Sequence, residues 1–127
     1  MIDHVSIGVR DFDRAVRFYE TVLATLGITK LVERVDTVGF GKKYPDFWLN
    51  RRGDLEIPRA DDGMHICMRA LSEVEVQAFH AAALAAGGTS DGEPGLRPEY
   101  TATYYAAFIR DPEGNRIEAV MFLPQAS

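Results

Sequence analysis

Two histidines and one glutamate are the side chains in this sequence that are best suited to carry chemistry. His4 and His65 each lie at the start of an alternating segment, and Glu118 lies in a third such segment near the C-terminus. Two neutral imidazoles and a carboxylate can hold a divalent metal ion while leaving coordination positions open for substrate or water. We therefore expect these three residues to be metal ligands, with Glu118 also serving as the catalytic carboxylate.

Strand periodicity predicts that the three side chains face the same way. In residues 2–9 an apolar set alternates with a second set that includes His4, and in residues 64–69 the second set includes His65. Residues 116–122 alternate in the same manner and leave Glu118 opposite their apolar residues. Because alternate side chains of a strand point to opposite faces, the apolar sets pack under a helix and the others face away from it.

An internal duplication supplies the framework for these segments. At an offset of 61 residues, four pairs match in type: His4 with His65, Phe18 with Phe79, Leu23 with Leu84, and Gly27 with Gly88. Each half has the pattern strand, helix and three strands. We predict an α+β fold in which two βαβββ modules pair into an open, barrel-like sheet around a central cavity. Residues 1–127 form a single domain, with module 1 at about 1–57 and module 2 at about 64–124.

The remaining periodicity and turn signals predict the other elements. Short strands are expected over 30–35, 37–41 and 46–50, followed by a polar linker over 51–63. Ser72 and Glu75 form a capping box that opens the second helix. A loop is expected from Gly88 to about Thr101, and the final strands, 103–110 and 116–122, flank a turn over 111–115.

Both ends of the chain resemble the vicinal oxygen chelate superfamily. The run from Asp3 to Val9, DHVSIGV, is similar to the opening of that superfamily, and the run from Asp111 to Glu118, DPEGNRIE, is similar to its ending. The superfamily includes glyoxalase I, extradiol dioxygenases, fosfomycin-resistance transferases and bleomycin-binding proteins. The resemblance covers essentially the whole chain and implies paired βαβββ modules, with His4, His65 and Glu118 as metal ligands.

The sequence departs from the family at a fourth ligand. The acidic residue that the family carries on the last strand of the first module is replaced here by Trp48, which cannot bind a metal. Glu56 is the nearest carboxylate and coordinates only if residues 54–57 form the true closing strand. The expected site is therefore a three-residue one, as in extradiol dioxygenases, with a four-residue site that includes Glu56 as the alternative.

Several aromatic residues are candidates for the walls of a substrate pocket. They are Trp48, Tyr100, Tyr104, Tyr105 and Phe108. Tyrosines beside the last hairpin could donate phenolic hydrogen bonds to a substrate oxygen, although aromatic residues that merely pack in strands explain them equally well. Cys67 is interpreted as a packing residue, and His80 is expected on the exposed side of the second helix.

Composition limits the class of partner and compartment. The 127 residues carry a net charge of −5, which disfavours nucleic acid because its phosphates repel an acidic surface. A single cysteine is typical of a reducing compartment, and neither a signal peptide nor an apolar run of membrane-spanning length is recognisable. We expect a cytoplasmic protein with a small-molecule substrate, no membrane partner and a homodimeric state. The modules could pair within one chain or across two.

Two functions from different classes follow. The first is a metal-dependent enzyme of the glyoxalase or dioxygenase type, in which Fe, Mn, Ni or Zn chelates two vicinal oxygens of a small substrate. The alternative is a metal-free protein that sequesters a small molecule, as antibiotic-resistance proteins do. A domain with a vestigial site, in which Glu118 pairs with Arg69 or Arg116, is the third possibility.

Overall fold

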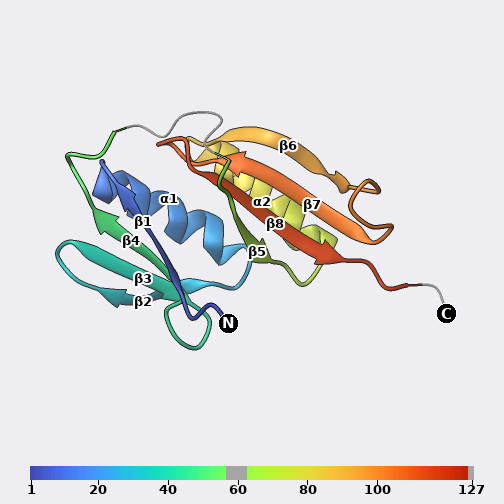
Figure 1. Cartoon of the computed structure of the whole chain (residues 1–127), viewed down its shortest axis with the longest axis horizontal. Coiled ribbons are helices and arrows are strands. Elements are labelled where there is room, and N and C mark those ends of the chain that lie inside the picture. Colours follow the sequence, from blue (N-terminus) through green and yellow to red (C-terminus); the bar gives the residue numbers. More distant parts are fainter. Residues whose placement is uncertain (57–62, 126–127) are drawn as a thin grey trace.

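Two four-stranded sheets, each with its own helix, make up the molecule (Figure 1). The computed structural model describes residues 1–56 and 63–125. The strand orders are β1-β4-β3-β2 and β5-β8-β7-β6. The elements are β1 (Val5–Val9), α1 (Phe12–Ala24), β2 (Thr29–Glu33), β3 (Thr37–Gly41), β4 (Phe47–Arg51), β5 (Ile66–Arg69), α2 (Glu73–Ala85), β6 (Thr89–Leu96), β7 (Tyr104–Arg110) and β8 (Arg116–Phe122).

The two modules repeat one topology. In each sheet the first strand pairs in parallel with the last, and the other pairings are antiparallel. The second module's first strand and its helix begin 61 residues after their counterparts, at Ile66 against Val5 and at Glu73 against Phe12. This confirms the predicted α+β fold of paired βαβββ modules. Within the described residues no strand pairing joins the two sheets, so the sheet is open.

Both helices begin at capping side chains, and the cap of α2 is the predicted capping box. Asp11 caps α1 and accepts a hydrogen bond from the backbone N–H of Arg14 at 3.3 Å. Ser72 caps α2 and accepts from the N–H of Glu75 at 3.1 Å, while the Glu75 carboxylate accepts from the N–H of Leu71 at 2.9 Å. These side chains satisfy N–H groups that have no partner inside the helix.

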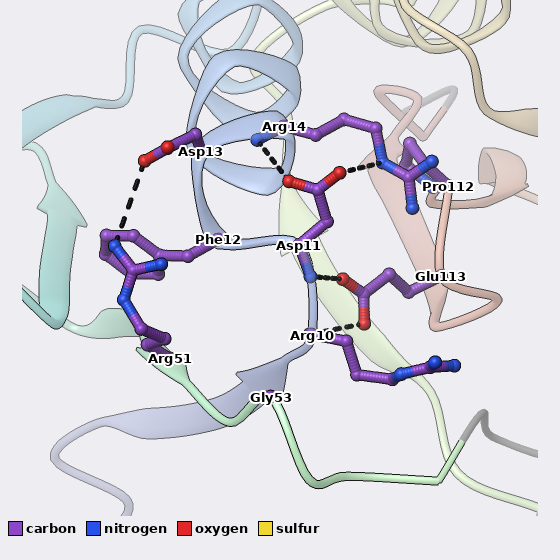
Figure 2. A pocket seen from close by; sticks show the side chains of 9 residues that line it. All are labelled: Arg10, Asp11, Phe12, Asp13, Arg14, Arg51, Gly53, Pro112 and Glu113. Atoms are coloured by element: carbon purple, nitrogen blue, oxygen red, sulfur yellow. Dashed lines mark hydrogen bonds and ion pairs between the residues drawn. The ribbon is translucent and has the colours of Figure 1, made fainter.

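The modules meet through their helices and through the turn between β7 and β8. Helices α1 and α2 pack against each other, and their apolar faces share one core with the strands. From the turn, the Asp111 carboxylate accepts a hydrogen bond from the hydroxyl of Tyr19 at 2.6 Å. The Glu113 carboxylate reaches the start of α1, where it accepts from the N–H groups of Arg10 and Asp11, both at 2.7 Å (Figure 2).

One predicted element is wrong. The segment expected to be a loop from Gly88 to about Thr101 contains β6, which pairs with β7. The register of this pairing shifts twice, between Ser90 and Gly92 and between Gly92 and Gly95. Bulges of this kind let a strand accommodate glycine and proline at a sheet edge. Of the predicted linker, Arg51 belongs to β4, and residues 57–62 lie outside the described residues.

No helix in the described part of the chain is both long and apolar enough to cross a membrane.

Candidate functional site

A cavity of about 750 Å³ brings together the two histidines of the repeat. Its lining comes from the residues around the start of β1, the turn between β3 and β4, and β5 with its flanking residues. His4 directly precedes β1 and His65 directly precedes β5, so the duplication places them at equivalent positions. Both histidines line the cavity. The sequence prediction that they share one space is therefore consistent with the geometry.

The carboxylate of Glu118 is the most deeply buried charged group in this region. Glu118 is only 1% exposed and lies on β8, the strand that pairs with β5. Its Oε1 lies 3.0 Å from Nε2 of His65, and its Oε2 accepts a hydrogen bond from the hydroxyl of Tyr104 at 2.5 Å. We call His65, Glu118 and Tyr104 the Glu118 cluster. A buried carboxylate needs such partners because desolvation is costly for an unpaired charge.

The two weak acids next to Glu118 stay protonated at neutral pH. Burial, followed by the hydrogen bond to Glu118, raises the pKa of the Tyr104 hydroxyl above its ordinary value. Burial, followed by the negative charge of Glu118, raises the pKa of the Cys67 thiol to about 12. Tyr104 is therefore the donor in its bond with Glu118. Cys67 therefore carries too little thiolate to act as a nucleophile. Its side chain is exposed, so it is not the buried packing residue that the sequence predicts.

His4 does not join the Glu118 cluster. Its Nδ1 lies 2.7 Å from Oδ1 of Asp3, and its side chain is 54% exposed. Among residues 1–56 and 63–125, no group of three or more His, Cys, Asp or Glu side chains is arranged to hold a metal ion. Within one chain, His65 and Glu118 therefore lie together and His4 lies apart from them. The sequence predicts that all three form one set of metal ligands.

The five aromatic candidates fall into two groups. Tyr104 belongs to the Glu118 cluster, Tyr100 packs edge-on against Tyr104 with ring centroids 5.0 Å apart, and the Phe108 ring lies 6.2 Å from that of His65. Tyr105, next in sequence to Tyr104, has its hydroxyl 2.9 Å from Nε2 of Gln77 on α2. Trp48 lies on β4 in the other sheet. The structure thus gathers three of the five around His65 and Glu118, but none of the five is among the residues that line the cavity.

Four more residues singled out in the sequence are Arg69, Arg116, Glu56 and His80. Neither arginine of the vestigial-site interpretation binds Glu118, since the Arg69 guanidinium lies 5.2 Å from the Phe122 ring centroid and Nε of Arg116 bonds Asp91 at 3.1 Å. Glu56 is exposed. The expectation for His80 is wrong because its side chain is buried at 5% exposure, with Nε2 2.8 Å from the hydroxyl of Ser90 on β6.

Sequence reasoning missed the basic residues of the cavity. Lys42 and Lys43 line it from the turn between β3 and β4, and Arg69 lines it from β5. The two adjacent lysines were visible in the sequence, at the turn that corresponds to the second module's turn over 111–115. Their position in the cavity depends on which turn lies near β5. Periodicity within a single strand does not predict how separate elements are arranged.

The Tyr104 hydroxyl has a testable role in supporting Glu118. Replacing Tyr104 by phenylalanine removes one donor from a buried carboxylate, and we expect a loss of about 2 kcal/mol in the free energy of unfolding. Tyr105→Phe is a matched control, because its hydroxyl bonds the exposed side chain of Gln77, and we expect a loss below about 1 kcal/mol. Urea denaturation measures both. Equal losses in the two variants would contradict the special role of Tyr104.

Comparison with known proteins identifies the family. Residues 1–119 match the model of the Glyoxalase/Bleomycin resistance protein/Dioxygenase superfamily. The chain belongs to this superfamily. A solved glyoxalase/bleomycin resistance protein from Albidiferax ferrireducens is 33% identical, with a TM-score of 0.80 over 93% of this chain and 96% of that one. Among functionally curated proteins, none matches.

More distant superfamily structures share the fold. A glyoxalase/bleomycin resistance protein/dioxygenase family enzyme from Burkholderia phytofirmans is 18% identical, with a TM-score of 0.71 over 96% of this chain and 98% of that chain. A glyoxylase/bleomycin resistance protein/dioxygenase domain from Frankia is 17% identical, with a TM-score of 0.72 over 97% of this chain and 98% of that one. At these identities the likeness establishes the fold alone.

Members of the superfamily commonly bind divalent metal ions, so the donor set of this chain must be compared with that property. His65 and Glu118 supply an imidazole nitrogen and a carboxylate oxygen 3.0 Å apart, which are ordinary metal ligands. The described residues of one chain bring no third His, Cys, Asp or Glu to them in a metal-binding arrangement. A single chain therefore brings together two of the three predicted metal ligands, His65 and Glu118, without His4.

Proposed function

We propose that the protein is a metal-dependent enzyme of the glyoxalase or dioxygenase type that acts on a small oxygenated molecule. The observation that carries the proposal is the buried Glu118 carboxylate, 1% exposed, with His65 Nε2 3.0 Å away beside an open cavity. When bound, a divalent metal would act as a Lewis acid that stabilises negative charge on two vicinal substrate oxygens. His65 and Glu118 would be its ligands in this chain, and Fe, Mn, Ni and Zn are the candidate ions.

We further propose that the active form is a homodimer in which His4 of a second copy of the chain completes the ligand set. Two observations support this. The His4 side chain is half-exposed and, within residues 1–56 and 63–125, bonds only its neighbour Asp3, while in one chain it stays apart from the Glu118 cluster. The sheets are also open rather than closed on each other, so a second copy has access to their free faces.

The surrounding residues have defined tasks in this proposal. Tyr104 holds Oε2 of Glu118 by its hydrogen bond, which leaves Oε1 directed at His65. A carboxylate held in this way reorganises less when a metal ion binds. In other metal sites, hydrogen-bond partners of the ligands orient them in the same manner. The rings of Phe108 and Tyr100 pack against His65 and Tyr104 and would hold these two side chains in place.

A metal-free binding protein is the second candidate. One observation favours it: both oxygens of Glu118 already have hydrogen-bond partners, so the buried carboxylate is satisfied without a cation. In that case the cavity, whose lining includes the aromatic rings of Tyr44 and Phe47, would hold the ligand directly.

Titration calorimetry separates the two candidates. Chelator-stripped protein is titrated with Fe²⁺, Mn²⁺, Ni²⁺ and Zn²⁺ in turn. The enzyme proposal predicts saturable binding of at least one ion, and a bound ion should raise the melting temperature by mass action. If none of the four ions binds, the metal-dependent proposal is wrong and the sequestration function takes its place.

A further inference from the structure

The cavity beside the Glu118 cluster carries an unbalanced positive charge. Three cationic side chains line it, those of Lys42, Lys43 and Arg69. Two carboxylates, Asp3 and Asp46, also line it. Oδ1 of Asp3 also lies 2.7 Å from Nδ1 of His4. The lining thus has three cationic side chains and two carboxylates, an excess of one positive charge.

None of the three cations forms an ion pair with a carboxylate within residues 1–56 and 63–125. Basic side chains elsewhere in the molecule do so: Lys30 pairs with Glu20 at 2.9 Å, and Arg51 pairs with Asp36 at 2.9 Å. The lining of the cavity therefore differs from the paired surface around it. It also differs in sign from the whole chain, whose net charge is −5.

Arg69 adjoins the Glu118 cluster, and Lys42 and Lys43 share the cavity lining with His65 of that cluster. Arg69 follows His65 and Cys67 along β5 at alternate positions, so the three share one face of that strand. The register of β5 with β8 places Cys67 opposite Glu118. The Arg69 guanidinium is held over the Phe122 ring at 5.2 Å, a contact that orders the side chain without neutralising its charge.

From this arrangement we propose that the substrate is an anion: a small molecule with a carboxylate or phosphate group in addition to the oxygens that meet the Glu118 cluster. Lys42, Lys43 and Arg69 bind the anionic group. A concave site with a net charge of one sign concentrates the opposite charge, because its low-dielectric walls focus the field. This inference rests on the proposed function and adds the substrate class to it.

Two matched probes test the charge requirement. Catechol and protocatechuate both carry vicinal hydroxyls, and only protocatechuate adds a carboxylate. We expect calorimetry to give protocatechuate an affinity at least about tenfold higher than catechol, with a preference that weakens as salt is added. The preference should fall below about threefold in the double variant Lys43→Gln/Arg69→Gln. Arg17→Gln, which removes an exposed charge on α1 outside the cavity, should leave it unchanged.

The outcomes distinguish this inference from the proposed function. Equal affinities for the two probes, no protocatechuate binding at all, or a preference that survives in the double variant would overturn the inference. Each titration is run with and without metal. If the protein binds no metal but still prefers protocatechuate to catechol, the enzyme proposal is wrong and the anion inference stands. Competition with acetate and with inorganic phosphate shows which anionic group the cations prefer. If neither anion competes with protocatechuate, the inference is wrong.

Discussion

Replacing Glu118 by glutamine is expected to lower the affinity for divalent metal by about tenfold or more. The carboxylate is 1% exposed and lies 3.0 Å from the imidazole of His65, so the change removes the only negative charge at the centre of the site. Glutamine keeps the size of the side chain and can still accept a hydrogen bond from Tyr104. The loss would therefore report the charge rather than the packing.

Thermal melts with and without metal measure this effect, since an ion that binds only the folded chain raises the melting temperature. The increment should disappear in Glu118→Gln. Glu56→Gln is the control, because Glu56 is exposed and is the alternative fourth ligand. An increment that survives in Glu118→Gln contradicts the assignment of Glu118. An increment that is lost in Glu56→Gln would instead establish a four-ligand site.

Replacing Asp111 by alanine is expected to cost about 3 kcal/mol in the free energy of unfolding. Asp111 is 4% exposed and accepts four hydrogen bonds: from the Tyr19 hydroxyl at 2.6 Å, and at 2.9 Å from the N–H of Glu113, the N–H of Asn115 and the side-chain amide of Asn115. Without it, the fully buried hydroxyl of Tyr19 loses its partner. The same turn places Glu113 at the start of α1 (Figure 2), so the contact between the modules weakens as well.

Urea denaturation of three variants tests this account. Tyr19→Phe should cost less than Asp111→Ala, about 1 kcal/mol, because the carboxylate keeps its three other donors. Asp54→Ala, at an exposed carboxylate 3.4 Å from Nε of Arg52, should change stability by less than about 0.5 kcal/mol. If Asp111→Ala costs no more than Asp54→Ala, the turn does not hold the modules together.

Strand parity and the internal repeat were sufficient to predict that His65 and Glu118 share one face of the second sheet. Alternation within 64–69 and 116–122 fixed the face of each side chain, and the register of β5 with β8 then brought the two side chains together. The same rule would have separated Tyr104 from Tyr105, because neighbours on a strand point to opposite faces. The structure places one hydroxyl on Glu118 and the other on α2.

Features that depend on contacts between elements were beyond sequence reasoning. The composition of β6, TSDGEPGL, is typical of a loop, and pairing with β7 nevertheless makes it a strand. His80 lies on a side of α2 that was expected to face solvent, and β6 covers that side through Ser90. For His4, the alternation of residues predicts the face of the strand on which the side chain lies. It does not predict the distance from His4 to His65 and Glu118 in the other module.

Mixed dimers test most directly whether His4 of one chain and the His65–Glu118 pair of another hold a single ion. The His4→Ala variant retains His65 and Glu118, and the Glu118→Gln variant retains His4. The two chains are unfolded, mixed in equal amounts and refolded, and the mixture is titrated with metal. We predict that the mixture binds metal with wild-type affinity at about a quarter of the wild-type stoichiometry, the fraction of intact sites from random pairing. Each variant alone should bind at least about tenfold more weakly than the wild type. A mixture that binds no more metal than the separate variants would contradict the shared site.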